Sequence, residues 1–160
     1  MSVIMNNILK QVFGIDVSMD TFVVRFGTTD TNQDQQISNS VSFKNTKDGF
    51  NKFIKWTRKH IISNDIPLFF VMEATGVYYE NLAYFLYSNN YNVSVVLPGK
   101  IRNYAKSLQT KSKTDPIDAA NITSFGLERK LNLWKPANSI IKPVKELCRE
   151  YHSTKIIITE

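Results

Sequence analysis

The chain has 160 residues, with 20 Lys and Arg against 14 Asp and Glu, so its formal net charge is +6. This length suits one domain with a real core, and a hydrophobic content of 42% is ordinary for a globular protein. Cys148 is the only cysteine, which excludes an internal disulfide and fits a reducing cytoplasm; no stretch resembles a signal peptide or approaches the roughly 20 apolar residues of a membrane span. The basic balance favours a polyanionic partner, or reflects only a solvated basic surface.

Three strands are predicted at the start of the chain, over residues 11–18, 21–28 and 37–43. The second is rich in β-branched and aromatic residues, and polar residues 29–36 separate it from the third. Short connections between successive strands predict an antiparallel meander.

The hydrophobic pattern then changes to helix–strand alternation. Thr46 is a candidate cap for a helix that carries Phe50, Phe53 and Ile54 on one face, and the fully apolar strand that follows is typical of the middle of a sheet. The later elements are predicted as strands at 68–72 and 91–97 and helices at 77–88, 101–108, 115–130 and 143–155. Together they predict an α/β fold with a mixed five-stranded sheet and helices on both faces.

Four acidic residues end strands or begin a helix. Asp16 closes the first strand, Glu73 closes the fourth, and Asp115 and Asp118 lie three positions apart at the start of the 115–130 helix. A carboxylate at the end of a buried strand is costly unless it is paired or bound to a metal, and strand ends are where α/β sheets place their sites. An all-carboxylate set predicts a divalent cation, Mg²⁺ or Mn²⁺, which suits phosphodiester chemistry.

Structural roles remain open for each of these residues. Pro116 suits the first helical position, which would make Asp115 an N-cap and Asp118 the third helical residue. Asp16 could instead serve a turn with the help of Ser18, and Glu73 could pair with a nearby Lys or Arg.

A basic segment leads into the last two aspartates and contains no acidic residue. Such a segment can neutralise phosphates, and Tyr104 within it could stack on an unpaired base; a solvated helix face is the alternative. The candidate nucleic-acid-binding residues are Lys100, Arg102, Tyr104, Lys106, Lys111 and Lys113.

Three motifs in this order resemble the N-terminal domain of the DEDD transposases, the insertion-sequence family related to the Piv and MooV DNA invertases and understood as RNA-guided recombinases. The motifs are Gly-Ile-Asp-Val-Ser at 14–18, Met-Glu-Ala-Thr-Gly at 72–76 and Lys-Ser-Lys-Thr-Asp-Pro-Ile-Asp-Ala at 111–119. The resemblance implies a RuvC-like domain of ribonuclease-H-like fold over residues 1–136.

The same resemblance implies a site and its partners. Asp16, Glu73, Asp115 and Asp118 would be catalytic and would bind Mg²⁺, with DNA as substrate, a guide RNA as partner and a homo-oligomer as the assembly of the full-length protein. Residues 137–160 would begin a helical linker to a C-terminal domain with a nucleophilic serine, a domain that this chain lacks. The expected location is the bacterial or archaeal cytoplasm, associated with the nucleoid.

Other functions are compatible with the same residues. A stand-alone Mg²⁺-dependent nuclease or junction resolvase would need the same carboxylates and no second domain, and a non-catalytic nucleic-acid-binding remnant would need none of them. An ATPase of the sugar-kinase and actin superfamily would need a glycine two positions after the first Asp, where this chain has Ser18.

Overall fold

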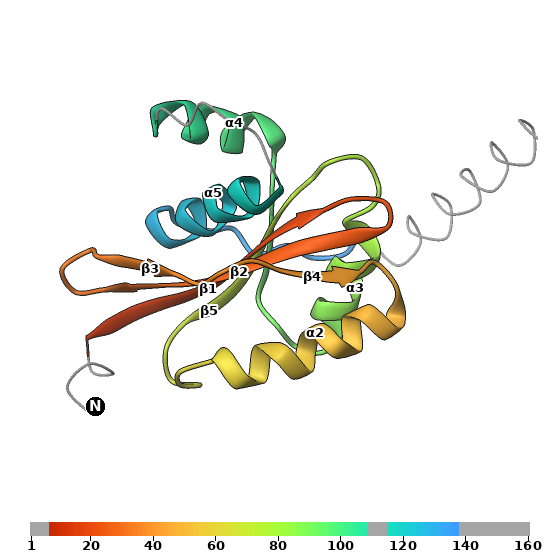
Figure 1. Cartoon of the computed structure of the whole chain (residues 1–160), viewed down its shortest axis with the longest axis horizontal. Helices are drawn as coiled ribbons and strands as arrows, with labels where there is room; N and C mark the ends of the chain where they lie inside the picture. The colour runs from red at the N-terminus through yellow and green to blue at the C-terminus, as the bar shows by residue number, and fades with distance from the viewer. Residues whose placement is uncertain (1–6, 109–114, 138–160) are drawn as a thin grey trace, which may run out of the picture.

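The computed structural model describes residues 7–108 and 115–137, with only the backbone described for 115–117. Its strands form one sheet in the order β3-β2-β1-β5-β6, and β4 also pairs with β2 (Figure 1). The strands are β1 (Ile8–Val17), β2 (Thr21–Asp30), β3 (Gln35–Ile37), β4 (Val41–Lys44), β5 (Leu68–Glu73) and β6 (Val93–Val96). The helices are α2 (Lys47–His60), α3 (Glu80–Ser88), α4 (Pro98–Ser107) and α5 (Asp115–Glu128).

Strand β1 lies at the change of direction in the sheet. It pairs antiparallel with β2 and parallel with β5, which in turn pairs parallel with β6. Helices α2 and α3 lie on one side of the sheet and α4 and α5 on the other (Figure 1). The predicted α/β class, mixed sheet, helices on both faces and ribonuclease-H-like strand order are therefore confirmed.

The third predicted strand is divided in two, so the described sheet has six strands rather than five. Gly27 of β2 pairs with Ile37 of β3, whereas Val24 pairs with Val41 of β4. Three residues, 38–40, therefore lie opposite two residues of β2, which is the geometry of a β-bulge. The Ser38 hydroxyl accepts a hydrogen bond from the Phe26 backbone N–H at 3.0 Å, so the bulge is held by a side chain.

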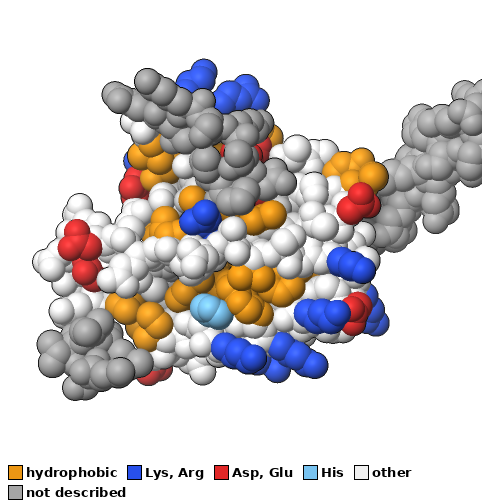
Figure 2. Space-filling view, in the orientation of Figure 1, with side chains coloured by type: hydrophobic (Ala, Val, Ile, Leu, Met, Phe, Trp, Pro, Cys, Tyr) orange, Lys and Arg blue, Asp and Glu red, His pale blue; other side chains and the backbone are white. Residues whose placement is uncertain are grey.

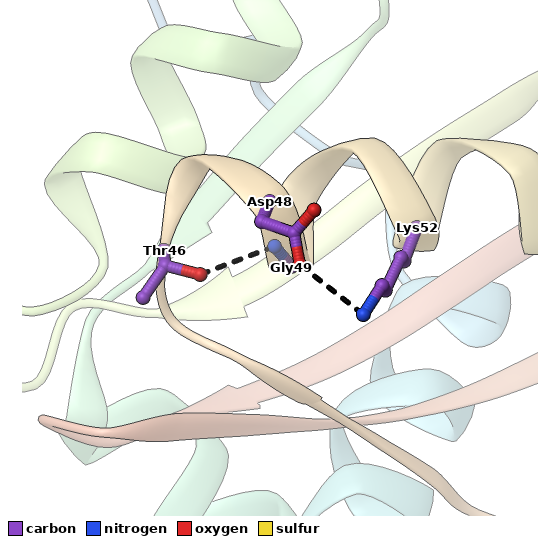
Figure 3. A network of polar contacts seen from close by, with 4 residues as sticks. All are labelled: Thr46, Asp48, Gly49 and Lys52. Carbon is purple, nitrogen blue, oxygen red and sulfur yellow. Dashed lines mark hydrogen bonds and ion pairs between the residues drawn. The ribbon is translucent and has the colours of Figure 1, made fainter.

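An aromatic cluster fills the space between the sheet and helices α2 and α3. Phe13 of β1 is fully buried, and its ring lies 4.7 Å from that of Phe26, 5.1 Å from that of Phe70 and 6.2 Å from that of Phe53. Helix α2 presents its apolar side to this cluster and begins as predicted, because the Thr46 hydroxyl accepts a hydrogen bond from the Gly49 N–H at 3.1 Å (Figure 3).

Small residues let helix α5 approach the other face of the sheet closely. A Cβ added at Gly14 of β1 would lie 2.5 Å from the backbone nitrogen of Thr123, and one added at Gly126 of α5 would lie 2.9 Å from methyl groups of Val12 and Val71. Glycine at these positions therefore sets the distance between helix and sheet.

We predict that Gly14→Ala destabilises the fold by about 3 kcal/mol or more, because the clash is with backbone that no rotamer change can move. Gly99→Ala is the matched control, since a Cβ at Gly99 in α4 meets nothing within 4 Å; it should stabilise by up to about 1 kcal/mol through helix propensity. Urea unfolding of both variants measures the difference, and equal effects would contradict this account of the packing.

Candidate metal and nucleic-acid site

Asp16 and Glu73 end two neighbouring parallel strands. The register of β1 and β5 pairs Gly14 with Val71 and Ile15 with Met72, so the next residues along the two strands are Asp16 and Glu73. Neighbouring strands lie about 4.8 Å apart. Because side chains alternate along a strand, both carboxylates share the face of Val12 and Val71, which is the face that α5 covers. The sheet therefore brings together two acidic residues that are far apart in the sequence.

Helix α5 runs antiparallel to β1 over these carboxylates. Its Gly126 packs against Val12 and its Thr123 against Gly14, so earlier residues of the helix lie progressively nearer the carboxyl end of β1. Ala119 is fully buried one turn before Thr123, and the half-buried Asp118 comes directly before it. The helix begins at Asp115, so both predicted aspartates lie on the end of α5 directed toward Asp16 and Glu73. The side chain of Asp115 is outside the described residues.

The two loops that follow the carboxylates are held by one side chain. Asn45 Nδ2 donates to the Ser18 carbonyl after β1 at 2.9 Å and to the Tyr78 carbonyl beyond β5 at 3.0 Å. Gly76 adopts φ +58° in the second loop, a backbone conformation that residues with a side chain rarely adopt. Ser18 also serves the turn after β1, donating its hydroxyl to the Thr21 carbonyl at 2.8 Å.

The described part of the chain contains only some of the candidate metal ligands. Its residues include no group of three or more His, Cys, Asp or Glu side chains placed to hold a metal ion. Among these residues Glu73 makes no ion pair within 4.0 Å, so they give no support to its predicted pairing with Lys or Arg. Two in-register carboxylates with a third on the covering helix have the chemistry that Mg²⁺ or Mn²⁺ requires, namely hard oxygen donors.

The basic segment falls largely on helix α4. Lys100, Arg102 and Lys106 are exposed there, as binding to phosphate would require. Lys111 and Lys113 lie outside the described residues.

The buried position of Tyr104 contradicts the prediction that its ring could stack on a base. The ring is only 5% exposed and packs edge-on against Phe125 of α5, with centroids 5.6 Å apart. Tyr104 follows Ile101 by three positions, and both point from α4 into the core beneath it. That spacing in the sequence could have indicated a core role.

The structure adds two cations that sequence reasoning missed. The open pocket between α4 and the end of α5 is lined by Lys100 together with Arg129 and Lys130. The Arg129 guanidinium lies 5.9 Å from the centre of the Tyr104 ring. The backbone carbonyl of Arg129 accepts a hydrogen bond from Lys10 Nζ at 2.9 Å. In the sequence, Arg129 and Lys130 look like ordinary helix-terminal cations.

Comparison with known proteins decides the family. Residues 13–155 match the family model DEDD_Tnp_IS110, described as transposase. The chain belongs to this transposase family. The match confirms the resemblance carried by the three motifs and extends beyond residue 136.

Curated relatives of this transposase-family chain include two pilin gene-inverting proteins. The protein of Moraxella lacunata is 35% identical over 150 residues, and that of Moraxella bovis is 34% identical over 150 residues. The matches cover 92% of this chain and 44% of each relative, so the chain spans less than half the length of these relatives. Among solved structures, Thermus thermophilus RuvC is 12% identical with a TM-score of 0.49, over 73% of this chain and 90% of that one.

No helix within the described ranges is both long and apolar enough to cross a membrane.

Burial of Tyr104 predicts a specific dependence of stability on pH. Burial, and then the nearby Glu128 carboxylate, raise the pKa of Tyr104 to about 12 from 10.0, and its hydroxyl makes no hydrogen bond of acceptable geometry. The folded protein thus keeps the phenol proton to higher pH than the unfolded chain does. The stabilisation that comes from keeping the buried phenol neutral is complete below pH 10 and is lost as pH rises from 10 to 12. It amounts to at most about 2–3 kcal/mol of unfolding free energy.

We therefore expect Tyr104→Phe to flatten the fall in unfolding free energy between pH 10 and 12, with little cost at pH 7 because the deleted hydroxyl has no partner. Tyr78→Phe, at a tyrosine that is 44% exposed, should keep the wild-type profile. Urea unfolding across this pH range is the measurement, and an unchanged slope for Tyr104→Phe would show that the ring is not held in the core as described.

Proposed function

We propose that this chain is the RuvC-like, metal-binding domain of a DNA transposase or recombinase. Its function would be to hold Mg²⁺ or Mn²⁺ at Asp16, Glu73, Asp115 and Asp118 against a phosphate of the DNA strand that is cleaved and transferred. The observation that carries the proposal is the register of β1 and β5, which sets Asp16 beside Glu73 on the face under α5. Family membership adds the reaction class.

The carboxylates have a clear chemical use in this role. A bound divalent cation would stabilise the negative charge that develops on the phosphate during transfer. Asp16 and Glu73 would contribute oxygen donors from the rigid sheet, and Asp118 one from the helix held against it by the Thr123–Gly14 contact. Two adjacent carboxylates repel each other, and a cation between them removes that repulsion.

The nucleic acid would lie over helix α4 and the end of α5. Lys100, Arg102 and Lys106, with Arg129 and Lys130 from the pocket wall, would neutralise phosphates without reading sequence. Lys111 and Lys113, which lie outside the described residues, belong to the same proposed set of phosphate-binding residues. A guide RNA, a homo-oligomeric assembly, a nucleoid-associated location in the cytoplasm, and a nucleophilic serine supplied by a C-terminal domain beyond the linker are further parts of the proposal.

Metal binding can be tested without any activity. Titration of the chain with Mn²⁺, followed by electron paramagnetic resonance of the free ion, should show one or two sites. Asp16→Asn and Glu73→Gln should each weaken binding by at least about tenfold, because each removes a ligand. Asp65→Asn is the matched control, since this exposed aspartate precedes β5 at the opposite end of the strand.

Wild-type affinity in both variants would contradict the metal site and favour a non-catalytic nucleic-acid-binding remnant. Specific cleavage of branched DNA by the chain alone with Mg²⁺ would instead favour a self-sufficient nuclease or resolvase.

The α4–α5 surface makes a separate prediction about salt. Lys100→Gln combined with Arg129→Gln should weaken binding to duplex DNA of any sequence and lower the slope of log affinity against log salt by about 2, roughly 1 for each phosphate contact. Lys135→Gln, at an exposed lysine outside both helices, should leave the slope unchanged. Fluorescence anisotropy between 50 and 200 mM salt is suitable, and equal slopes in all three proteins would exclude this surface.

A further inference from the structure

Helix α2 carries most of the excess charge of the chain. Its 14 residues include five cations, Lys47, Lys52, Lys55, Arg58 and Lys59, and one acidic residue, Asp48. The helix therefore contributes +4 of the formal net charge of +6. Figure 2 shows Lys and Arg side chains gathered over the position of α2. We call these five residues the α2 basic ridge.

The α2 basic ridge is confined to one side of the helix. At 3.6 residues per turn, the five cations fall within an arc of about 140°, and the opposite arc carries the buried Phe50, Phe53 and Ile54. Lys52 pairs with Asp48 at 3.1 Å (Figure 3), and no other ridge residue forms an ion pair within 4.0 Å in the described part of the chain. Most of this positive charge is therefore available to a partner.

Helix stability explains only part of this arrangement. Arg58 and Lys59 in the last turn interact favourably with the helix dipole, but Lys47 is in the first turn, where a cation is unfavourable. Lys52 and Lys55, Lys55 and Arg58, and Lys55 and Lys59 are like-charged pairs at three- and four-residue spacing, which destabilise a helix. The pattern thus opposes local stability, which points to a partner of opposite charge.

The ridge starts at the same end of the sheet as the carboxylates. Asn45, two residues before α2, binds the loops that follow β1 and β5, and its backbone N–H donates to the Asp20 carbonyl at 2.8 Å. At its other end the helix is followed by Ile62, whose N–H donates to Gln11 Oε1 of β1 at 2.7 Å. The ridge therefore extends for about 18 Å from the carboxylate end of β1 back along the opposite face of the sheet.

We propose that the α2 basic ridge is a second nucleic-acid contact, which holds the phosphate backbone of duplex DNA as it leaves the carboxylate end of the sheet. Duplex DNA is favoured over single strands because the exposed arc has no aromatic residue for base stacking; Trp56 and His60 are half-buried and pack against each other at a tilt, with ring centres 4.2 Å apart. The choice of DNA rests on the proposed function, whereas the charge and position of the ridge do not.

The test compares two triple variants of the chain with the wild type. Lys47→Gln/Lys55→Gln/Lys59→Gln removes three unpaired charges and leaves the Asp48–Lys52 pair intact, and Lys47→Arg/Lys55→Arg/Lys59→Arg keeps the charges as a matched control. Anisotropy with a labelled 30-base-pair duplex is measured in EDTA, so that metal binding plays no part. The Gln variant should bind on the order of tenfold more weakly at 100 mM salt, with the salt slope reduced by about 2 to 3, and the Arg variant should match the wild type.

The result separates this inference from the proposed function. If the Gln variant binds like the wild type while Lys100→Gln/Arg129→Gln loses affinity, the ridge is only a solvated face and the inference fails alone. A second titration with single-stranded RNA of 30 nucleotides checks the ligand, because a loss confined to RNA overturns the assignment to duplex DNA. All three positions are exposed, so each variant should keep its helices. Circular dichroism checks this expectation.

Discussion

The close contact between helix α5 and strand β1 determines the geometry of the candidate site. Thr123 occupies the space that a side chain at Gly14 would fill, and a side chain at Gly126 of the helix would collide with Val12 and Val71 of the sheet. Backbone therefore packs near backbone, and the helix has little freedom to shift along the strand. The earlier residues of α5, including Asp118, are positioned over the sheet by this contact.

The two faces of the sheet consequently play different parts. Large rings between the sheet and helices α2 and α3, centred on Phe13, Phe53 and Phe70, supply most of the apolar burial. The opposite face uses small residues and keeps α5 close to the sheet. Asp16 and Glu73 lie on the face that α5 covers, toward the end of the helix that carries Asp118, while the aromatic packing on the other face stabilises the fold.

Much of this could be predicted from the sequence because it depends on local pattern. The apolar runs ending at Asp16 and Glu73 identified two strand ends, and Thr46 marked the start of α2, since strands and caps are encoded by neighbouring residues. The split into β3 and β4 was missed because a bulge depends on the partner strand.

Tertiary packing explains the remaining differences. The basic residues around Tyr104 in the sequence favour a role in binding nucleic acid. The packing of α4 against α5 instead places its ring against Phe125. Arg129 and Lys130 join Lys100 only through that same pairing. The placement of the acidic residues could be predicted only in part. The neighbouring positions of Asp16 and Glu73 could be anticipated from the fold class, whereas the direction in which α5 crosses the sheet follows from the glycine contacts.

The single side chain of Asn45 has a mechanical consequence for the carboxylate end of the sheet. Both of its amide hydrogens are used, one on the turn after Asp16 and one on the loop after Glu73, and the backbone of Asn45 is itself bonded to Asp20. Either loop must break its hydrogen bond to Asn45 before it can move away. One side chain therefore restrains both the turn after Asp16 and the loop after Glu73, and links them at the end of the sheet where the two carboxylates lie.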